Sequence, residues 1–397
     1  MKQKLIKTKN AYICLSLITL AAATLALLIS NGSLFQVFFF MDPDDTGMDF
    51  FNSIVETATR RPYEQYGVLY PPLANLFFYI LTLFIPNDIK AGWPDSHDGV
   101  KFMVGNREDL RLMQSSMMLF LIFLIITLFI MAKMIHARTG SYLLTFCLVF
   151  SAGTLAAIER GNVILLAFIL TFYFVEHYKD ENRLTSELAL LALAAAFGFK
   201  LYPCIFGLLL IKDRKWAAAG RCILYAVLLT VLPTLVFEGP KAISLWLETV
   251  FGFGGFSTDT TSTSGLTTAS EGAKLSSVPF SWILAAVLGV LLLIIFLVRK
   301  NGNPLLQLHN SQILFLIAYL SLLIGGGAGG YNLLFFIIPF LSFLSETDKL
   351  NYRNCIEFLL YLVCLLPVGI NEFNVCFFMV YIIGVLIRNS NGTAQAF

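Results

Sequence analysis

The sequence predicts an all-α integral membrane protein that crosses the bilayer repeatedly. Of its 397 residues, 57% are hydrophobic and only 13% are charged. A soluble domain of this size could not bury so much apolar surface, whereas a bilayer can. Uncharged runs at 112–132, 142–158 and 280–298 each approach the roughly 20 residues that cross a hydrocarbon core. None has the alternating pattern of a membrane β-barrel, so helices are expected.

The whole chain, residues 1–397, is expected to form a single membrane domain. Polar stretches at 41–69, 87–111 and 238–279 lie between apolar runs, and no soluble domain interrupts them. Because no basic domain lies outside the membrane, nucleic acid is not an expected partner. We expect about 12 or 13 hydrophobic segments. They lie near 11–30, 70–86, 112–134, 142–158, 163–177, 188–199, 202–211, 222–237, 280–298, 311–325, 331–345, 355–370 and 374–388.

We expect a multi-pass protein of the cell (plasma/inner) membrane, and its basic residues predict that the N-terminus lies in the cytoplasm. Four lysines precede the first hydrophobic segment, and the densest basic loop lies at 212–221. Positively charged loops stay cytoplasmic. No convincing cleavage site follows the first segment, so we expect an uncleaved signal anchor. The stretch 41–69 is then the first external loop, and 238–279, rich in Gly, Ser and Thr over 251–279, is a second.

The segment 70–86 creates a conflict in this topology. If 41–69 and the basic residues of 133–138 face opposite sides, an odd number of crossings must separate them. The two hydrophobic segments 70–86 and 112–134 give an even number. Either 70–86 is interfacial or re-entrant, or one basic loop breaks the charge rule.

The first external loop carries an unusual concentration of carboxylates. Asp49 precedes Phe50, Phe51 and Ile54, a spacing that predicts an amphipathic interfacial helix. At that position a carboxylate can act as a general base or simply cap the helix. The other three carboxylates flank turn residues, and the pair at 42 and 44 has the spacing of a divalent-cation site, although no histidine accompanies it. These three residues are Asp42, Asp44 and Asp45.

A second candidate for chemistry lies at Lys200. The segments 187–199 and 201–211 are each too short to span a bilayer as a helix. Pro203 breaks the helix between them and places the Lys200 ammonium at membrane depth, next to Tyr202. Broken helices occur at that depth only where they line a cavity.

Two further charged pairs each allow a functional and a structural interpretation. Arg60 and Arg61 could grip a phosphate or a lipid headgroup, or they could anchor the membrane boundary. Glu159 and Arg160 could neutralise each other at a short turn. Alternatively, Arg160 or Asn162 could face the same polar cavity as Lys200.

The glycine-rich stretch 325–330 lacks the lysine of a phosphate-binding loop, so we interpret it as a reversal between helices. Tyr331 and Asn332 follow it as candidate polar contacts. The four histidines lack ligand spacing and the seven cysteines mostly lie in apolar runs, so neither set predicts a metal site. No cofactor is expected, apart from the divalent-cation alternative in the first external loop.

These motifs, taken in order over residues 1–345, resemble glycosyltransferase family 87, the polyprenol-phosphate-mannose-dependent mannosyltransferases of the GT-C superfamily. One motif departs from the family pattern, because Arg160-Gly161-Asn162 replaces Gly-Gln-x-Asn. The resemblance implies that Asp49 matches the catalytic base. The motifs are Asp49-Phe50, Pro62-Tyr63, Tyr70-Pro71-Pro72-Leu73, Gly161-Asn162, Lys200 to Pro203, Lys215-Trp216 and a late Tyr-rich helix ending in Pro339.

The resemblance implies transfer of a hexose, usually mannose, from a polyprenyl-phosphate donor to an extracytoplasmic glycolipid or glycan by inverting displacement. The expected donor-binding residues are Lys200, Arg160, Arg60, Arg61 and Tyr202, and the expected substrate-positioning residues are Tyr70, Asn162, Asp45, Tyr331 and Asn332. An oligosaccharide polymerase or ligase is a first alternative, although the loop 238–279 lacks the arginines that such an enzyme often carries. A secondary transporter is a second, although no internal repeat is visible. A structural scaffold is a third.

Overall fold

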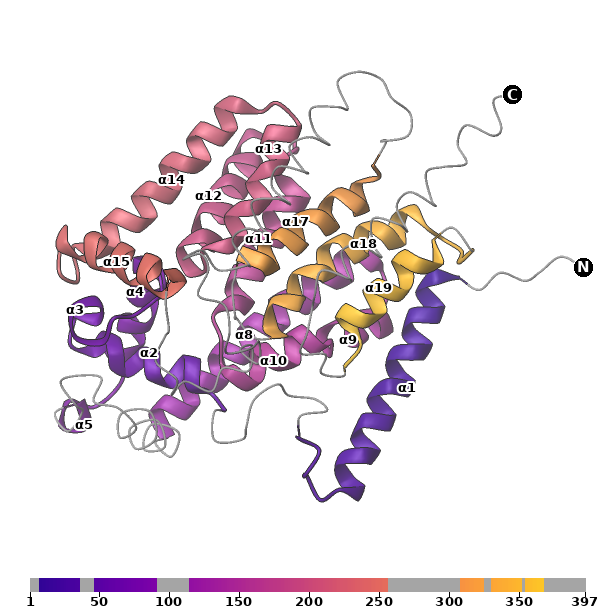
Figure 1. Cartoon of the computed structure of the whole chain (residues 1–397), viewed down its shortest axis with the longest axis horizontal. Helices are drawn as coiled ribbons and strands as arrows, with labels where there is room; N and C mark the ends of the chain where they lie inside the picture. Colours follow the sequence, from indigo (N-terminus) through magenta and orange to yellow (C-terminus); the bar gives the residue numbers. More distant parts are fainter. Residues whose placement is uncertain are drawn as a thin grey trace, which may run out of the picture.

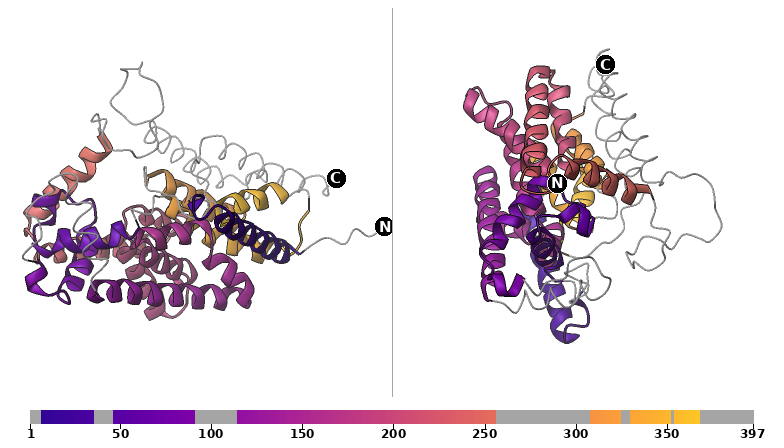
Figure 2. Two further views of the ribbon diagram at one scale, coloured as in Figure 1. Left: turned by 90° about the horizontal axis from the view of Figure 1, so that it is seen from below. Right: turned by 90° about the vertical axis from the view of Figure 1, so that its left-hand side faces the viewer.

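The computed structural model is mostly helical over the residues that it describes, which confirms the predicted all-α class. It describes residues 7–35, 46–90, 114–255, 308–324, 330–351 and 354–367, with side chains described in most of these. Within these ranges the only β-type pairing is an isolated bridge between Lys7 and Lys349. Figures 1 and 2 show the helices packed side by side, with α2, α3, α4 and α15 gathered at one end and the start of α1 at the other.

Three described helices are long and apolar enough to cross a membrane: α1 (Thr8–Ile29), α8 (Gln114–Thr139) and α14 (Trp216–Thr234). Large apolar side chains cover their outer surfaces; Ile29 is 75% exposed and Phe129 is 68% exposed. Exposed apolar area of this extent is typical of a surface that faces lipid. The protein is therefore a polytopic membrane protein.

The run 142–158, expected as one span, forms two helices instead. The helices α9 (Tyr142–Val149) and α10 (Ala152–Arg160) meet at an angle of 53°. The chain bends because Ser151 takes an extended backbone conformation, which interrupts the helical hydrogen bonds. Counting this bent pair as one span brings the described total to four.

The remaining described helices are shorter, and two of them correct the expected boundaries. Helix α12 begins at Arg183, before the expected segment, because the Asn182 side chain accepts hydrogen bonds from the first-turn amides. Helix α15 occupies part of the stretch 238–279 that was expected to be a loop, and 256–279 lies outside the described residues. These helices are α2 (Met48–Ala58), α3 (Pro62–Tyr66), α4 (Pro72–Thr82), α5 (Asn87–Lys90), α11 (Ile164–His177), α12 (Arg183–Phe199), η4 (Tyr202–Gly207), α13 (Leu208–Lys212), α15 (Lys241–Gly255), α17 (Asn310–Ile324), η7 (Gly330–Phe336), α18 (Ile337–Glu346) and α19 (Cys355–Leu365).

Polar contacts define a basic end of the helical body. The Lys9 Nζ atom donates to the Thr139 carbonyl at 3.3 Å, which places the start of α1 beside the end of α8. The end of α11 joins them through an ion pair of 3.6 Å between Arg138 and Glu176. We call this the basic end; its basic residues are Lys9, Arg138, Lys179, Lys212 and Lys215.

The length of α4 bears on the topological conflict of the segment 70–86. The helix has 11 residues, about 16 Å at 1.5 Å per residue, which is too short to span a bilayer. Between residues 46–69 and 133–138, α8 is then the only described helix of spanning length. This agrees with the interfacial or re-entrant alternative for 70–86, and the sidedness of the two stretches stays a prediction.

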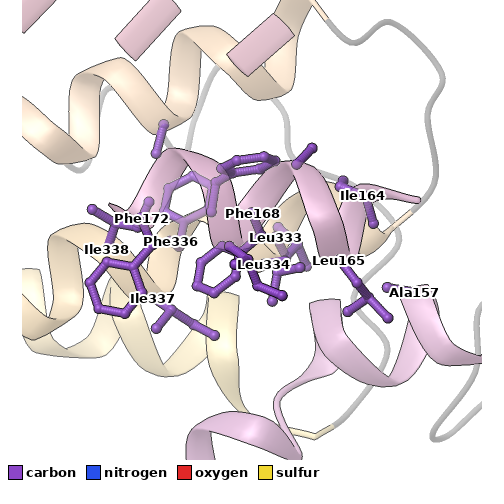
Figure 3. Close-up of a cluster of buried hydrophobic side chains, with 14 of the residues drawn as sticks. Ala157, Ile164, Leu165, Phe168, Phe172, Leu333, Leu334, Phe336, Ile337 and Ile338 are labelled. Atoms are coloured by element: carbon purple, nitrogen blue, oxygen red, sulfur yellow. The ribbon is translucent and has the colours of Figure 1, made fainter. Parts of the chain in front are cut away.

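The apolar core brings α10 against η7 at very short range. Figure 3 shows Leu333, Leu334 and Phe336 of η7 in one apolar cluster with Phe168 of α11, and Ala157 of α10 beside Leu165 at the edge of that cluster. A Cβ atom on Gly153 would lie 2.2 Å from the Leu334 backbone nitrogen. Only glycine therefore permits this approach.

Replacing Gly153 by Ala is expected to destabilise the protein by about 1–3 kcal/mol, because the added methyl group must push η7 away from α10. Gly220→Ala is the matched control: Gly220 lies in α14 with nothing within 4 Å of its Cβ position. That control is expected to be neutral or to stabilise by up to about 1 kcal/mol, since alanine favours a helix. Thermal unfolding in detergent measures both, and equal effects would contradict the close packing.

Candidate functional site

The start of α2 is fixed against the end of α10 by a backbone contact between two glycine turns. The Gly47 amide donates to the Glu159 carbonyl at 2.7 Å. Gly47 and Gly161 both have positive φ, and a Cβ atom on Gly161 would lie 2.8 Å from the Phe50 side chain. Glycine is therefore required here for both conformation and space.

Aromatic side chains hold α2 in place from the other side. The Phe50 ring packs on Phe78 of α4 and on Phe120 and Phe123 of α8, with ring centroids 5.2–5.8 Å apart. The predicted amphipathic helix therefore exists, and the apolar residues that predicted it are buried against protein. Asp49 lies in its first turn without capping it, since Gly47 is the N-cap residue and no side-chain cap is formed.

The Asp49 carboxylate receives hydrogen bonds from two residues of the turn after α10. Its Oδ1 atom accepts from Arg160 Nη2 at 2.9 Å, and its Oδ2 atom accepts from Asn162 Nδ2. The side chains of Asp49 and Arg160 are only 15% and 10% exposed, so water screens this ion pair weakly. Asn162 is itself fixed, because its Oδ1 atom accepts from the Ile164 amide at 2.9 Å.

Lys200 reaches the same site from the break between α12 and η4. Its Nζ atom lies 4.2 Å from the ring centroid of Tyr70 and 5.5 Å from that of Tyr331. The ammonium is close enough to Asp49 and Arg160 to interact with both charges. One carboxylate and two cations thus converge from three separate segments of the chain. The two cations are groups that can bind an anion.

The hydroxyl group of Tyr202, on η4, belongs to the same site. It lies close enough to Asp49 and Tyr331 to interact electrostatically. Its hydroxyl is buried and has no hydrogen-bond partner within the described ranges. Buried hydroxyls are usually bonded, so an orphaned one beside charged groups is typical of a site that awaits a ligand.

Tyr70 is held by a hydrogen-bond network that the sequence did not indicate. Tyr63 donates its hydroxyl to the Tyr70 carbonyl at 3.0 Å, and the Asn162 amide lies 3.4 Å from the Tyr70 hydroxyl. Trp246 of α15 donates to the Leu69 carbonyl at 3.2 Å. Because Tyr63 and Trp246 act on backbone carbonyls, no spacing in the sequence marks them.

An acidic residue after α14 supports the same segment. Glu238 Oε1 accepts from the amides of Tyr63 and Glu64 at 3.0 and 3.1 Å, at the start of α3. Hydrogen bonds and charge from Arg61, and then from Lys241, lower the pKa of the exposed Glu64 carboxyl. Glu238, which lies between α14 and α15, thereby connects these helices to the loop that carries Tyr70.

The structure gives the two predicted loop arginines other neighbours. Arg60 lies over the Tyr79 ring at 5.0 Å, and Arg61 pairs with Glu64 at 2.9 Å. Asn332 is buried in η7, next to Tyr331. Asp42, Asp44 and Asp45 lie outside the described residues. Where the chain is described, no group of three or more His, Cys, Asp or Glu side chains could hold a metal ion.

Comparison with protein-family models shows to which family the chain belongs. The model of glycosyltransferase family 87 matches residues 69–324, which is more than half of the chain. The chain belongs to glycosyltransferase family 87. Neither the curated proteins nor the solved structures yield a significant match.

Membership of glycosyltransferase family 87 makes the protein a membrane transferase that takes a sugar donor and an acceptor within or beside a lipid bilayer. It favours this function over the transporter and scaffold alternatives. The matched range includes Tyr70, Arg160, Asn162, Lys200 and Tyr202 and ends before Tyr331. Asp49 precedes the range, and its contacts with Arg160 and Asn162 connect it to the matched part.

Proposed function

We propose that this enzyme transfers a hexose from a polyprenyl-phosphate donor to a glycolipid or glycan acceptor outside the plasma membrane, with inversion at the anomeric carbon. Mannose is the sugar that the resemblance implies. The observation that carries the proposal is the convergence of the Asp49 carboxylate with the cations of Arg160 and Lys200. A base beside a pair of cations is what attack on a phosphate-activated sugar requires.

In this mechanism Asp49 is the general base. The acceptor oxygen attacks the anomeric carbon, its proton passes to the Asp49 carboxylate, and the bond from that carbon to the phosphate oxygen breaks on the opposite face. A carboxylate offers about four lone-pair sites. Arg160 and Asn162 occupy one site on each oxygen, which leaves room for the acceptor hydroxyl.

The departing phosphate takes the electron pair of the broken bond and needs positive charge and hydrogen-bond donors. Lys200 and Arg160 supply the charge. Tyr202 supplies a hydroxyl that has no partner within the described part of the protein. We assign Tyr70, Tyr331, Asn162 and Asn332 to positioning of the sugar and the lipid phosphate. Arg60 and Arg61 would meet the donor farther from the reacting carbon, since both have other neighbours.

The same proposal places the basic end in the cytoplasm and the candidate site at the outer leaflet. The supporting observation is that the basic residues gather at the end opposite to Asp49. A GT-C-like arrangement follows, with the catalytic Asp on an external loop after the first span. We propose that no divalent cation takes part, and a cation held by Asp42 and Asp44 is the alternative that a chelator tests.

The function can be tested with purified protein, radiolabelled polyprenyl-phosphate hexoses and a membrane lipid extract, each assayed with and without chelator. We expect transfer from one polyprenyl-phosphate sugar, insensitivity to chelator, and inverted configuration in the product. Transfer from a nucleotide sugar alone, or retained configuration, would overturn the proposal. Loss of activity with chelator would instead support the divalent-cation alternative.

Tyr202→Phe is expected to lower the rate of transfer by roughly tenfold or more, since a hydrogen bond to a charged group contributes about 1.5–3 kcal/mol. Thermal stability should stay the same or rise, because the lost hydroxyl has no described partner. Tyr63→Phe is the comparison, since its hydroxyl bonds to the Tyr70 carbonyl and its loss should also lower stability. Normal transfer by Tyr202→Phe would remove this residue from the donor site.

A further inference from the structure

The helix that carries Asp49 has a polar face that continues beyond this residue. Each residue of an α-helix advances by about 100° around the axis, so Asn52, Ser53 and Glu56 lie on the same side of α2 as Asp49. We call these four residues the polar face of α2. Ser53 is already bonded within the helix, because its Oγ atom donates to the Asp49 carbonyl at 2.7 Å. The mechanism proposed above uses neither Asn52 nor Glu56.

Contacts at both ends of the polar face show where it points. At one end the Asp49 carboxylate accepts from the Asn162 amide. At the other end, about 10 Å farther along the axis at 1.5 Å per residue, Glu56 lies close enough to Tyr70 to interact with it electrostatically. The Asn162 amide also lies 3.4 Å from the Tyr70 hydroxyl. The polar face therefore points toward the segment that carries Tyr70, with Asn52 between its two carboxylates.

The side-chain amide of Asn52 is available to a ligand. The residue is only 8% exposed. Its side chain makes no hydrogen bond within the part of the chain that the structure describes. An amide side chain offers two donor hydrogens and one acceptor oxygen, and buried groups of this kind are usually bonded. Asn52 thus resembles Tyr202, whose buried hydroxyl also lacks a described partner.

The charges along α2 indicate which ligand fits. Lys200 interacts with Asp49 and Arg160, which is where the departing phosphate belongs. Glu56 adds a partly buried carboxylate at the far end of the polar face, and this charge would repel a phosphate. A carboxylate accepts hydrogen bonds from hydroxyl groups, and an amide both donates to them and accepts from them. The ligand of Asn52 and Glu56 is therefore a neutral molecule with several hydroxyls.

The direction of an inverting displacement assigns this molecule to the acceptor. The attacking oxygen and the departing phosphate lie on opposite faces of the anomeric carbon. Since Lys200 and Arg160 hold the phosphate in the proposed mechanism, the acceptor approaches Asp49 from the other side. The rest of the acceptor can then extend along the polar face of α2, past Asn52 to Glu56.

We propose that Asn52 and Glu56 bind hydroxyl groups of a sugar ring in the acceptor, while another hydroxyl of that ring gives its proton to Asp49. This inference rests on the proposed function and adds a substrate class to it. The acceptor is a sugar, and a lipid or protein that offers one isolated hydroxyl would leave both side chains without a partner.

The test uses the purified full-length protein with saturating radiolabelled polyprenyl-phosphate hexose and increasing amounts of membrane lipid extract. Asn52→Ala is expected to raise the apparent KM for the extract by roughly three- to tenfold. Glu56→Gln should raise it by roughly tenfold or more, because a hydrogen bond to a charged group is the stronger one. The rate with saturating extract and the KM for the donor should stay near wild type, since binding lost equally from ground and transition states changes KM alone.

Two substitutions serve as controls for these variants. Ser53→Ala changes a buried residue of the same face whose hydroxyl is bonded within the helix. Glu64→Gln changes an exposed glutamate of α3 that pairs with Arg61. Both should keep the wild-type KM for the extract. Thermal unfolding in detergent is measured for every variant, and if Glu56→Gln is less stable than the wild type, Asn52→Ala decides.

Mild periodate treatment of the extract supplies an independent test of the substrate class. Periodate cleaves the vicinal diols of sugars and spares isolated hydroxyls, so the treated extract should no longer accept the hexose. A water-soluble oligosaccharide fraction, assayed in parallel, distinguishes a free glycan from a glycolipid. An unchanged KM in both variants, or full transfer to treated extract, would overturn this inference and leave the proposed function intact. Absence of transfer by the wild type would contradict the proposed function itself.

Discussion

Asp49→Asn is expected to abolish sugar transfer in a protein that still inserts and folds. Asparagine has the same shape as aspartate, and its carbonyl oxygen can still accept from Arg160. It cannot take a proton from the acceptor, and loss of a general base typically costs about 100- to 10,000-fold in rate. Initial rates with saturating donor and acceptor measure this loss.

The stability of the Asp49→Asn variant needs its own measurement, because Arg160 loses its counter-ion in a mostly buried site. Glu64→Gln is the matched control: Glu64 lies in the same external region and is partly exposed, where it pairs with Arg61 and Lys241. That variant should keep wild-type activity. Wild-type turnover by a folded Asp49→Asn protein would show that Asp49 is not the general base.

Two members of the site could be predicted because their chemistry conflicts with their surroundings. Asp49 is a carboxylate at the start of an aromatic helix, and Lys200 is an ammonium next to a proline break. Both charges are energetically costly beside apolar segments. The sequence does not reveal that they meet. Asp49 reaches Arg160 across 111 positions of the chain, and only the packing of α2 on α10 brings the two together.

The supporting residues could not be predicted, since each acts on a backbone atom. Tyr63 and Trp246 donate to carbonyls near Tyr70, and Glu238 accepts from amides at the start of α3. A hydrogen bond to the main chain imposes no residue type on its partner, so no motif records it. The resemblance did include the Pro62-Tyr63 pair, although without a role for it.

The predicted helix boundaries were wrong where an apolar composition gave no sign of a local backbone feature. The run 142–158 is apolar throughout, and the bend at Ser151 depends on one backbone conformation that composition does not encode. The segment 70–86 is also apolar, but its helix ends at Thr82 and is too short to cross a bilayer. An apolar segment in this part of the chain is therefore not always a single helix of spanning length.

The charge distribution of the site predicts a selective effect for Lys200→Met. Lys200 lies between the Tyr70 and Tyr331 rings. Methionine preserves the apolar contact with both rings and removes only the charge. We expect kcat/KM for the polyprenyl-phosphate donor to fall by roughly 100- to 1,000-fold, the usual effect of removing one group that stabilises a developing anion. The KM for the acceptor should change little.

Comparing two substitutions separates charge from packing at this position. Lys200→Arg keeps a cation between the two rings and should recover part of the donor kcat/KM, because guanidinium also stacks on aromatic faces. Lys241→Met is the control, since Lys241 is an exposed lysine paired with Glu64. An equal loss for donor and acceptor would mean that Lys200 shapes the site without binding phosphate. A loss confined to the donor, with recovery by arginine, would assign the leaving phosphate to the space between Lys200 and Arg160.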